Sequence, residues 1–201
     1  HMECYRNPSA LTEQIKQTVR IQVLLCIHRA HEREFNHIHL SACWSSIGKL
    51  ARQRSAERCW LERHAQMLQS LAEYTARKTK DGQVEARQLS NIAHGAASHR
   101  ITDESLHILF RALAGETARR VSDFNAHDLG NTAWGFATVS HKDERLFTTL
   151  ADAAERQMRD FNLQDLANTA WAFVTVGHKE ERLFSTLAAA AKQTIRDLKS
   201  H

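Results

Sequence analysis

The stretch FNAHDLGNTAWGFATVSHKDERLFTTLADAAERQMRD, residues 124–160, decides the fold because residues 161–197 repeat it as FNLQDLANTAWAFVTVGHKEERLFSTLAAAAKQTIRD. The two copies follow one another without a gap and are identical at 24 of 37 positions. Each copy contains two apolar helical patterns around a polar turn. A period of this length with two helices per unit is typical of a helical solenoid, in which each unit packs on its neighbours.

The first residues of each unit carry the signals of a helix start. Asn125 and Asn162 stand at the N-cap position, and Asp128 and Asp165 follow three residues later. Side-chain oxygens at these positions can accept hydrogen bonds from the free amides of a first helical turn. Apolar residues then recur at three- and four-residue steps, which predicts an amphipathic first helix in each unit.

The first helix of each unit ends differently in the two copies and carries a tryptophan in both. Gly177 favours a left-handed helix end, whereas Ser140 occupies the matching position in the other copy.

We interpret Trp134 and Trp171 as packing between units, with base or ligand stacking as the alternative. If Trp171 is a core residue, its truncation to alanine should cost about 3–5 kcal/mol.

The rest of the chain contains more divergent units. Residues 84–123 form one degenerate repeat, and residues 35–83 form another that is expanded by a basic turn at 49–58 before a second helix at about 59–78. Residues 1–34 predict one long N-terminal helix that packs on the solenoid as a cap. We therefore expect an all-α, right-handed αα superhelix of about four helical-hairpin repeats plus an N-terminal capping helix, forming one solenoid domain.

The cysteines, the hydropathy and the N-terminal residues indicate the compartment in which the protein is expected to occur. The four cysteines lack CxxC spacing, which favours reduced thiols and an intracellular reducing compartment. No stretch is long and apolar enough to predict a membrane partner. His1–Met2 resembles a cloning remnant, so we expect the chain to be a fragment of a longer protein, and a targeting segment could precede it.

Charge is unevenly distributed along the chain. Residues 1–83 contain 13 Lys and Arg against 8 Asp and Glu, whereas residues 84–201 contain 14 against 15. The positive excess is therefore confined to the N-terminal part. Because Lys and Arg supply most nonspecific affinity for nucleic acid, this asymmetry favours the N-terminal part as the place where phosphates would bind.

The segments LGNTAWGFATVS and LANTAWAFVTVG resemble the octotricopeptide and heptatricopeptide repeats, which are helical hairpins of 38 and 37 residues. The resemblance is close over residues 124–197, partial over 84–123 and weak over 35–83. It implies an αα superhelix that binds RNA, usually in the matrix of mitochondria or chloroplasts. Similar repeats in secreted bacterial effectors imply an alternative, a scaffold that binds a host protein in the host cytosol.

Candidate RNA-binding positions lie on the first helices and in the basic turn. First-turn residues that differ between units could read bases, although they could also be merely solvated, and the invariant asparagines could instead bond neighbouring turns. The basic turn could contact phosphates or be a flexible surface loop. The candidates are Arg87, His127 and Gln164 as variable positions, Asn91, Asn131 and Asn168 as invariant positions, and Lys49, Arg52, Arg54 and Arg58 in the turn.

Catalytic motifs are absent from the sequence. It contains no phosphate-binding glycine loop, no HExxH metal motif and no nucleophile elbow. Histidines and cysteines crowd residues 26–43, but their spacing does not predict a closed zinc site. We therefore expect a non-enzymatic protein without cofactor or small-molecule substrate, with single-stranded RNA as the leading partner and a protein as the alternative.

Overall fold

The computed structural model describes residues 8–199, and every regular element in that range is helical. None of these helices is long and apolar enough to cross a membrane. The helices are α1 (Pro8–Gln17), α2 (Ile21–His31), α3 (His37–Gln53), α4 (Ser55–Arg63), α5 (Gln69–Lys80), α6 (Ala86–Ser98), α7 (Glu104–Arg120), α8 (Ala126–Thr138), α9 (Glu144–Arg156), α10 (Leu163–Val176) and α11 (Glu181–Lys199).

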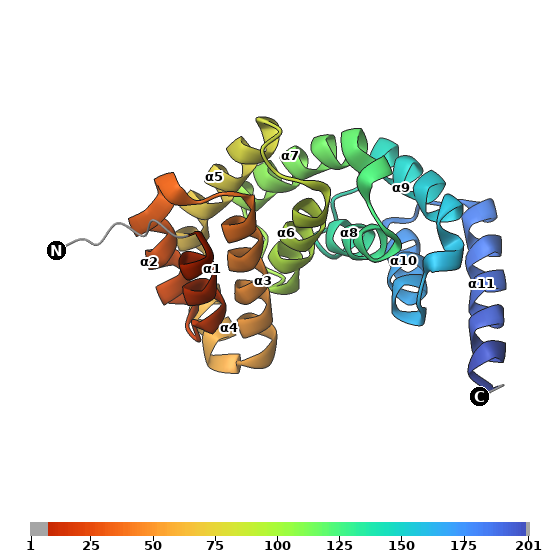
Figure 1. Cartoon of the computed structure of the whole chain (residues 1–201), viewed down its shortest axis with the longest axis horizontal. Coiled ribbons are helices and arrows are strands. Elements are labelled where there is room, and N and C mark those ends of the chain that lie inside the picture. Colours follow the sequence, from red (N-terminus) through yellow and green to blue (C-terminus); the bar gives the residue numbers. More distant parts are fainter. Residues whose placement is uncertain (1–7, 200–201) are drawn as a thin grey trace.

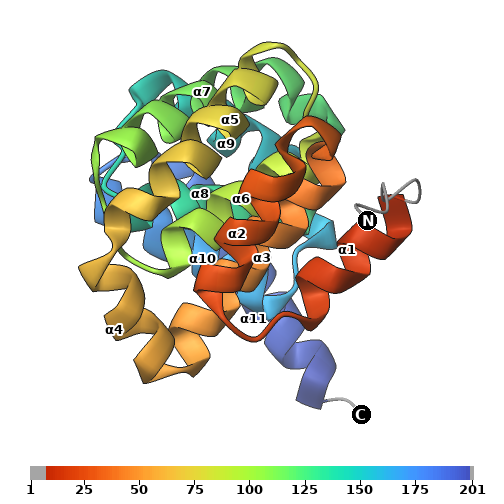
Figure 2. The ribbon, with the colours of Figure 1, turned by 90° about the vertical axis from the view of Figure 1, so that its left-hand side faces the viewer.

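The helices form two curved layers, as expected for an all-α helical-repeat solenoid (Figure 1). In the inner layer α3, α6, α8 and α10 pack side by side, with α1 against α3. In the outer layer α2, α5, α7, α9 and α11 follow one another in the same way. Figure 2 shows that α4 projects away from both layers, below the outer helices. Each inner helix therefore keeps one face clear of the outer layer.

Local side-chain chemistry starts the inner helices as predicted. Asn125 Oδ1 and Asn162 Oδ1 each accept a backbone amide at 2.9 Å, and Asp128 and Asp165 complete the two capping boxes. Asn36 caps α3 in the same way, although its box is completed by a histidine. The cap positions are therefore set by the residues on either side of them in the chain.

The inner helices α8 and α10 end in the left-handed backbone region. Gly177 has φ 75° and Ser140 has φ 56°. The amides that follow, those of His141 and His178, bond back to carbonyls of the preceding helix at 3.0 and 3.1 Å. The backbone amides of these histidines therefore close the ends of α8 and α10. Ser140 carries a Cβ where glycine would be unstrained.

Replacing Ser140 by glycine is expected to raise the free energy of unfolding by about 1 kcal/mol, because it relieves a left-handed residue with a side chain. Gly177→Ala should lower it by a similar amount, since its added Cβ would meet no atom within 4 Å and only the backbone strain would change. Urea unfolding of both variants checks the pair. A stabilising effect of Gly177→Ala would contradict this explanation.

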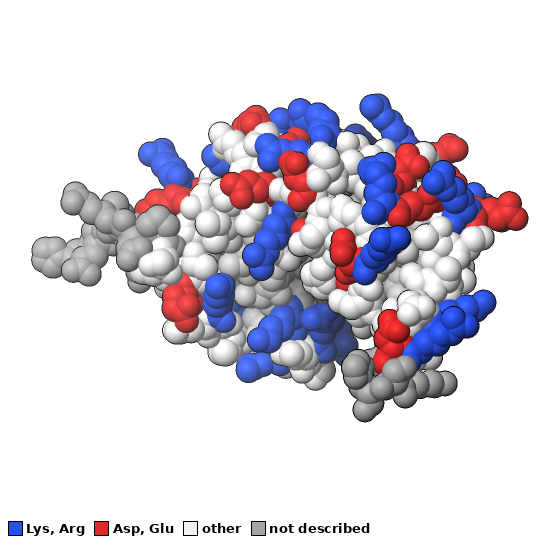
Figure 3. All heavy atoms as spheres, turned by 45° about the vertical axis from the view of Figure 1, so that its right-hand side comes forward, with Lys and Arg blue, Asp and Glu red and all other residues white. Residues whose placement is uncertain are grey.

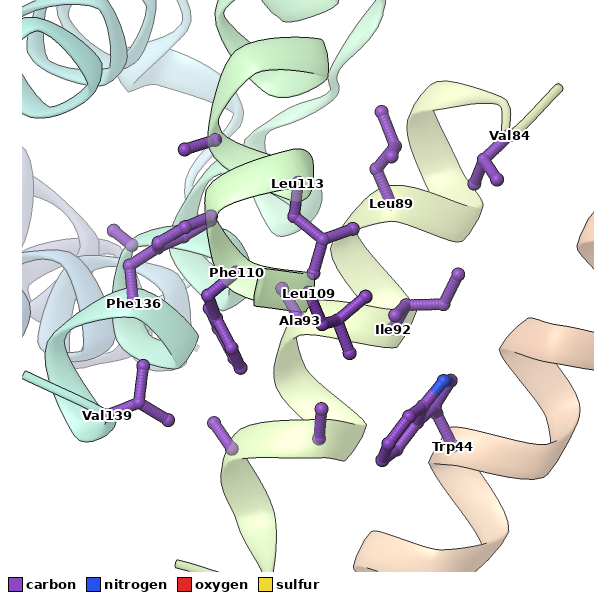
Figure 4. Packing of buried hydrophobic residues seen from close by; sticks show 14 of the residues in the cluster. Trp44, Val84, Leu89, Ile92, Ala93, Leu109, Phe110, Leu113, Phe136 and Val139 are labelled. Atoms are coloured by element: carbon purple, nitrogen blue, oxygen red, sulfur yellow. The ribbon is translucent and has the colours of Figure 1, made fainter. Parts of the chain in front are cut away.

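The core fills the space between the two layers. Phe110 from α7 and Phe136 from α8 meet edge to face with ring centroids 5.2 Å apart (Figure 4). Trp44 of α3 is fully buried beside α6, and its indole Nε1–H donates to Thr75 Oγ1 at 3.0 Å. Neighbouring inner helices also approach at glycines, where a Cβ on Gly95 would lie 2.6 Å from the Trp44 carbonyl. Aromatic packing and close helix contacts therefore hold consecutive units together.

The prediction of one long N-terminal helix is wrong. The chain breaks between α1 and α2, and each helix packs in a different layer. A distant side chain holds this break, because the Glu57 carboxylate accepts the Ile21 amide at 2.7 Å at the start of α2. Arg54 also donates to the Val19 carbonyl at 3.4 Å. The N-terminal cap is therefore a helical hairpin.

The predicted basic turn at 49–58 and second helix at about 59–78 are also wrong. Helix α3 continues to Gln53, and α4 begins at Ser55. The outer helix of this unit is α5, which begins only at Gln69 after a short 3₁₀ turn. The buried face of α3 extends through Leu50 and Ala51, so packing continues the helix beyond the length seen in the regular units.

Candidate functional site

The clear face of the inner helices carries most of the candidate residues. Arg87, Asn91 and His94 stand at positions i, i+4 and i+7 of α6, which places them on one side of that helix. Arg87 is exposed, and the other two side chains are partly buried. The position of Arg87 is occupied by His127 in α8 and by Gln164 in α10. We call this surface of α1, α3, α6, α8 and α10 the inner face.

A basic cleft of about 600 Å³ opens on the inner face between α1, α3 and α6. Its cationic residues are Lys16, Lys49 and Arg87, one from each helix. None of the described residues that line it is acidic. The remaining lining residues offer hydroxyl and amide groups, or small and apolar contacts: Thr12, Ile38, Ser41, Ala42, Ser45, Ser46, Gln88 and Asn91. The cleft can therefore hold an anion with several polar donors.

The structure divides the predicted basic cluster. Lys49 lines the basic cleft, and the charge of Arg52 acts on His94 of α6. Arg54 lies at the junction of α3 and α4, and Arg58 lies on α4, outside the cleft lining. These residues belong to helices and their junction, so the flexible-loop alternative is wrong. Only part of the cluster faces the candidate site.

Basic residues in the C-terminal half have acidic neighbours. Arg182 pairs with Glu155 at 2.8 Å. The cleft at the turns after α8 and α10 contains lysines together with carboxylates, namely Lys142 and Lys179 with Asp143, Glu144 and Glu180. Figure 3 shows Lys and Arg gathered at the lower edge of the view and a mixture of both signs at the upper right. Positive charge without nearby carboxylates is therefore confined to part of the surface.

Polar side chains on α8 and α10 bond to one another. His127 Nδ1 lies 2.9 Å from the buried carboxylate of Asp165, and its Nε2 lies 2.8 Å from Asn131 Nδ2. A neutral imidazole that donates through Nδ1 and accepts through Nε2 satisfies both contacts. Gln164 likewise donates to Asn168 at 2.8 Å. These asparagines therefore bond the turn before them within the same helix, while His127 links two units.

A row of aromatic rings continues the inner face beyond the basic cleft. It consists of His94, Trp134 and Trp171, which occupy the same position in α6, α8 and α10 and which we call the aromatic row. Ring centroids are 4.8 Å apart between His94 and Trp134, and 6.3 Å apart between the two tryptophans. The tryptophans therefore pack between units as interpreted, but Trp171 is 46% exposed, so the expectation that it is a core residue is wrong.

His94 contributes an uncharged ring to this row. Burial lowers its pKa to about 4, and the positive charge of Arg52 lowers it as a lesser cause. At neutral pH its imidazole is therefore unprotonated. It can pack against Trp134 as an aromatic surface and does not repel the cations of the neighbouring cleft.

Sequence reasoning missed two parts of this face. Lys16 gave no signal, because its place in the cleft depends on the break between α1 and α2. The exposure of Trp171 could have been inferred, since it lies seven residues after Gln164 and thus on the same side of the helix. The same spacing relates Trp134 to His127.

These features define an α-helical repeat protein with a basic cleft and an aromatic row on its inner face. The chain belongs to the RNA-editing substrate-binding complex 6 protein family, whose family model matches residues 25–201. None of the curated proteins matches the chain significantly. The family match does not confirm the resemblance to octotricopeptide repeats, and it gives no support to the bacterial-effector alternative.

Proposed function

We propose that this protein is a non-enzymatic, RNA-binding component of an RNA-editing substrate-binding complex, and that it holds single-stranded RNA on its inner face. The observation that carries the proposal is the basic cleft, where Lys16, Lys49 and Arg87 converge from three helices without an acidic residue among the described lining. The name of the family, which refers to an RNA-editing substrate-binding complex, agrees with an RNA ligand.

The chemistry of the cleft suits a phosphate backbone. Lysine and arginine neutralise phosphates, while serine hydroxyls and the amides of Gln88 and Asn91 can bond phosphate or ribose oxygens. Such groups fix a strand in place without reading its sequence. We therefore propose RNA binding with weak sequence preference in the cleft. Base contacts by His127 and Gln164 are a separate proposal.

A second candidate function is contact with another protein of such a complex. It is favoured by Leu163 and Val174 of α10, which are 41% and 68% exposed. Ala126 and Ala137 occupy the matching positions in α8 and are buried. Exposed apolar side chains mark protein interaction sites where they form a contiguous patch, whereas single ones are common on any surface.

Binding of the purified chain to a fluorescent pool of single-stranded RNA tests the proposal, with duplex DNA as the competitor. We expect micromolar affinity that prefers RNA and weakens as salt rises. Combining Lys49→Ala with Arg87→Ala should lower the slope of log affinity against log salt by about 1.4, since each phosphate contact on a single strand contributes about 0.7.

The matched control replaces one lysine and one arginine of the outer layer, Lys80 of α5 and Arg111 of α7, both exposed. This control variant should bind RNA with the affinity and salt slope of the unchanged protein. Circular dichroism of each variant verifies that it is folded. Equal losses in both double variants, or no RNA binding at low salt, would reject the basic cleft as an RNA site.

A further inference from the structure

The aromatic row presents ring surface that the core does not use. Trp44 is the contrasting case, since it is 0% exposed and its indole N–H is bonded to a threonine hydroxyl. Trp134 is only partly buried, and nearly half of Trp171 is exposed. Within residues 8–199, neither of these two indoles donates a hydrogen bond to another side chain or carbonyl. Trp134 also contacts His94 and Trp171, so the exposed part of each indole ring, together with its N–H group, is the surface available to a ligand.

The aromatic row is continuous with the basic cleft. Ser45 of α3 lines the cleft and occupies the position that corresponds to His94 in α6. The charge of Arg52, at the end of α3, also acts on His94. A strand with phosphates in the cleft would therefore pass onto Trp134 and Trp171 when it continues along the inner face.

Nucleobases are the ligand groups that fit this arrangement. Aromatic side chains beside a positively charged groove bind single strands by stacking on the bases, and every base has a ring face to offer. A duplex conceals those faces inside its own stack, so the row would favour unpaired bases. An uncharged His94 ring can take part in this stacking. Stacking also explains why a tryptophan that is only partly buried in one regular unit, and 46% exposed in the other, stands at this position.

We propose that the aromatic row stacks the unpaired bases of the RNA strand whose phosphates lie in the basic cleft. This inference rests on the proposed function, and it adds that the aromatic row recognises the bases of the bound RNA. The row binds bases, and the cleft binds the backbone. Preference for single strands over duplexes then arises at Trp134 and Trp171, and salt dependence arises at Lys16, Lys49 and Arg87.

The test compares a uridine oligonucleotide with an abasic strand of the same length and the same ribose-phosphate backbone. Trp134→Ala and Trp171→Ala should each weaken binding of the uridine strand on the order of tenfold, as removal of one stacking partner does in other single-strand binding proteins. Binding of the abasic strand should not change. Replacement of both tryptophans by phenylalanine should retain most of the affinity, because phenylalanine keeps a stacking ring.

Tryptophan fluorescence gives a second readout on the same titrations. The uridine strand should quench the unchanged protein, and quenching should be largely lost in the double phenylalanine variant although it still binds. Trp60→Ala is the matched control, because Trp60 lies on α4, stacked on His64 at 4.7 Å, and should not affect binding.

The outcomes separate the two proposals. If the unchanged protein binds the uridine strand and the alanine variants bind it equally well, the aromatic row is not a base-stacking site, while RNA binding in the cleft stands. The same conclusion follows if the uridine and abasic strands bind the unchanged protein with equal affinity. If neither strand binds at low salt, the proposed function itself fails, and this inference fails with it.

Discussion

Replacing Phe136 by alanine is expected to lower the free energy of unfolding by about 3–5 kcal/mol. The side chain is 0% exposed and projects from α8 into the space between the layers (Figure 4). Its ring packs edge to face on Phe110 of α7 at 5.2 Å and lies 5.4 Å from the His141 ring. Truncation removes buried apolar surface and leaves a cavity that the rigid helix pairs around it can close only in part.

Trp171→Ala is the comparison for this prediction, because it removes an aromatic side chain that is partly exposed. It deletes a larger side chain, but one that is 46% exposed, so we expect a loss of only about 1 kcal/mol or less. Urea unfolding of both variants, followed by circular dichroism, measures the two losses. A loss above about 3 kcal/mol for Trp171→Ala would show that the indole is a core group and would remove the physical basis for the aromatic row as a ligand surface.

The parts of the fold that followed from the sequence are those that neighbouring residues determine. Asn125 with Asp128 starts a helix by bonding its own first amides, and Gly177 ends one because its backbone reaches positive φ without strain. A repeated pattern also reveals which side of each helix is buried. The two regular units and their two-helix construction could therefore be predicted.

The N-terminal part depends on contacts between residues far apart in the chain. The break before α2 is held by Glu57, 36 residues after the amide that it accepts. No local pattern marks Glu57 as a cap for Ile21. The basic cleft could not be predicted from local sequence for the same reason, because Lys16 lines it only when the break before α2 lets α1 pack against α3. Helical spacing placed Arg87 on the inner face, but it could not supply the cleft around it.

Replacing Gly95 by alanine is expected to lower the free energy of unfolding by about 2 kcal/mol, because α6 lies against the backbone of α3 at this point. The added Cβ would lie 2.6 Å from the Trp44 carbonyl carbon and oxygen and 2.8 Å from the Ser45 nitrogen. These are backbone atoms in the middle of a helix, so they cannot move aside as a side chain can. The two inner helices must separate, and the basic cleft between them must widen.

Gly115→Ala is the same substitution at a site without neighbours and should have the opposite sign. Gly115 lies within α7, and a Cβ there would meet no atom within 4 Å. Only the backbone preference changes, and alanine favours the helix by about 1 kcal/mol relative to glycine. Urea unfolding of the pair therefore isolates the close approach of α3 and α6. If Gly95→Ala stabilised the protein as Gly115→Ala should, the helices would not be in close contact, and the geometry of the cleft would have to be reconsidered.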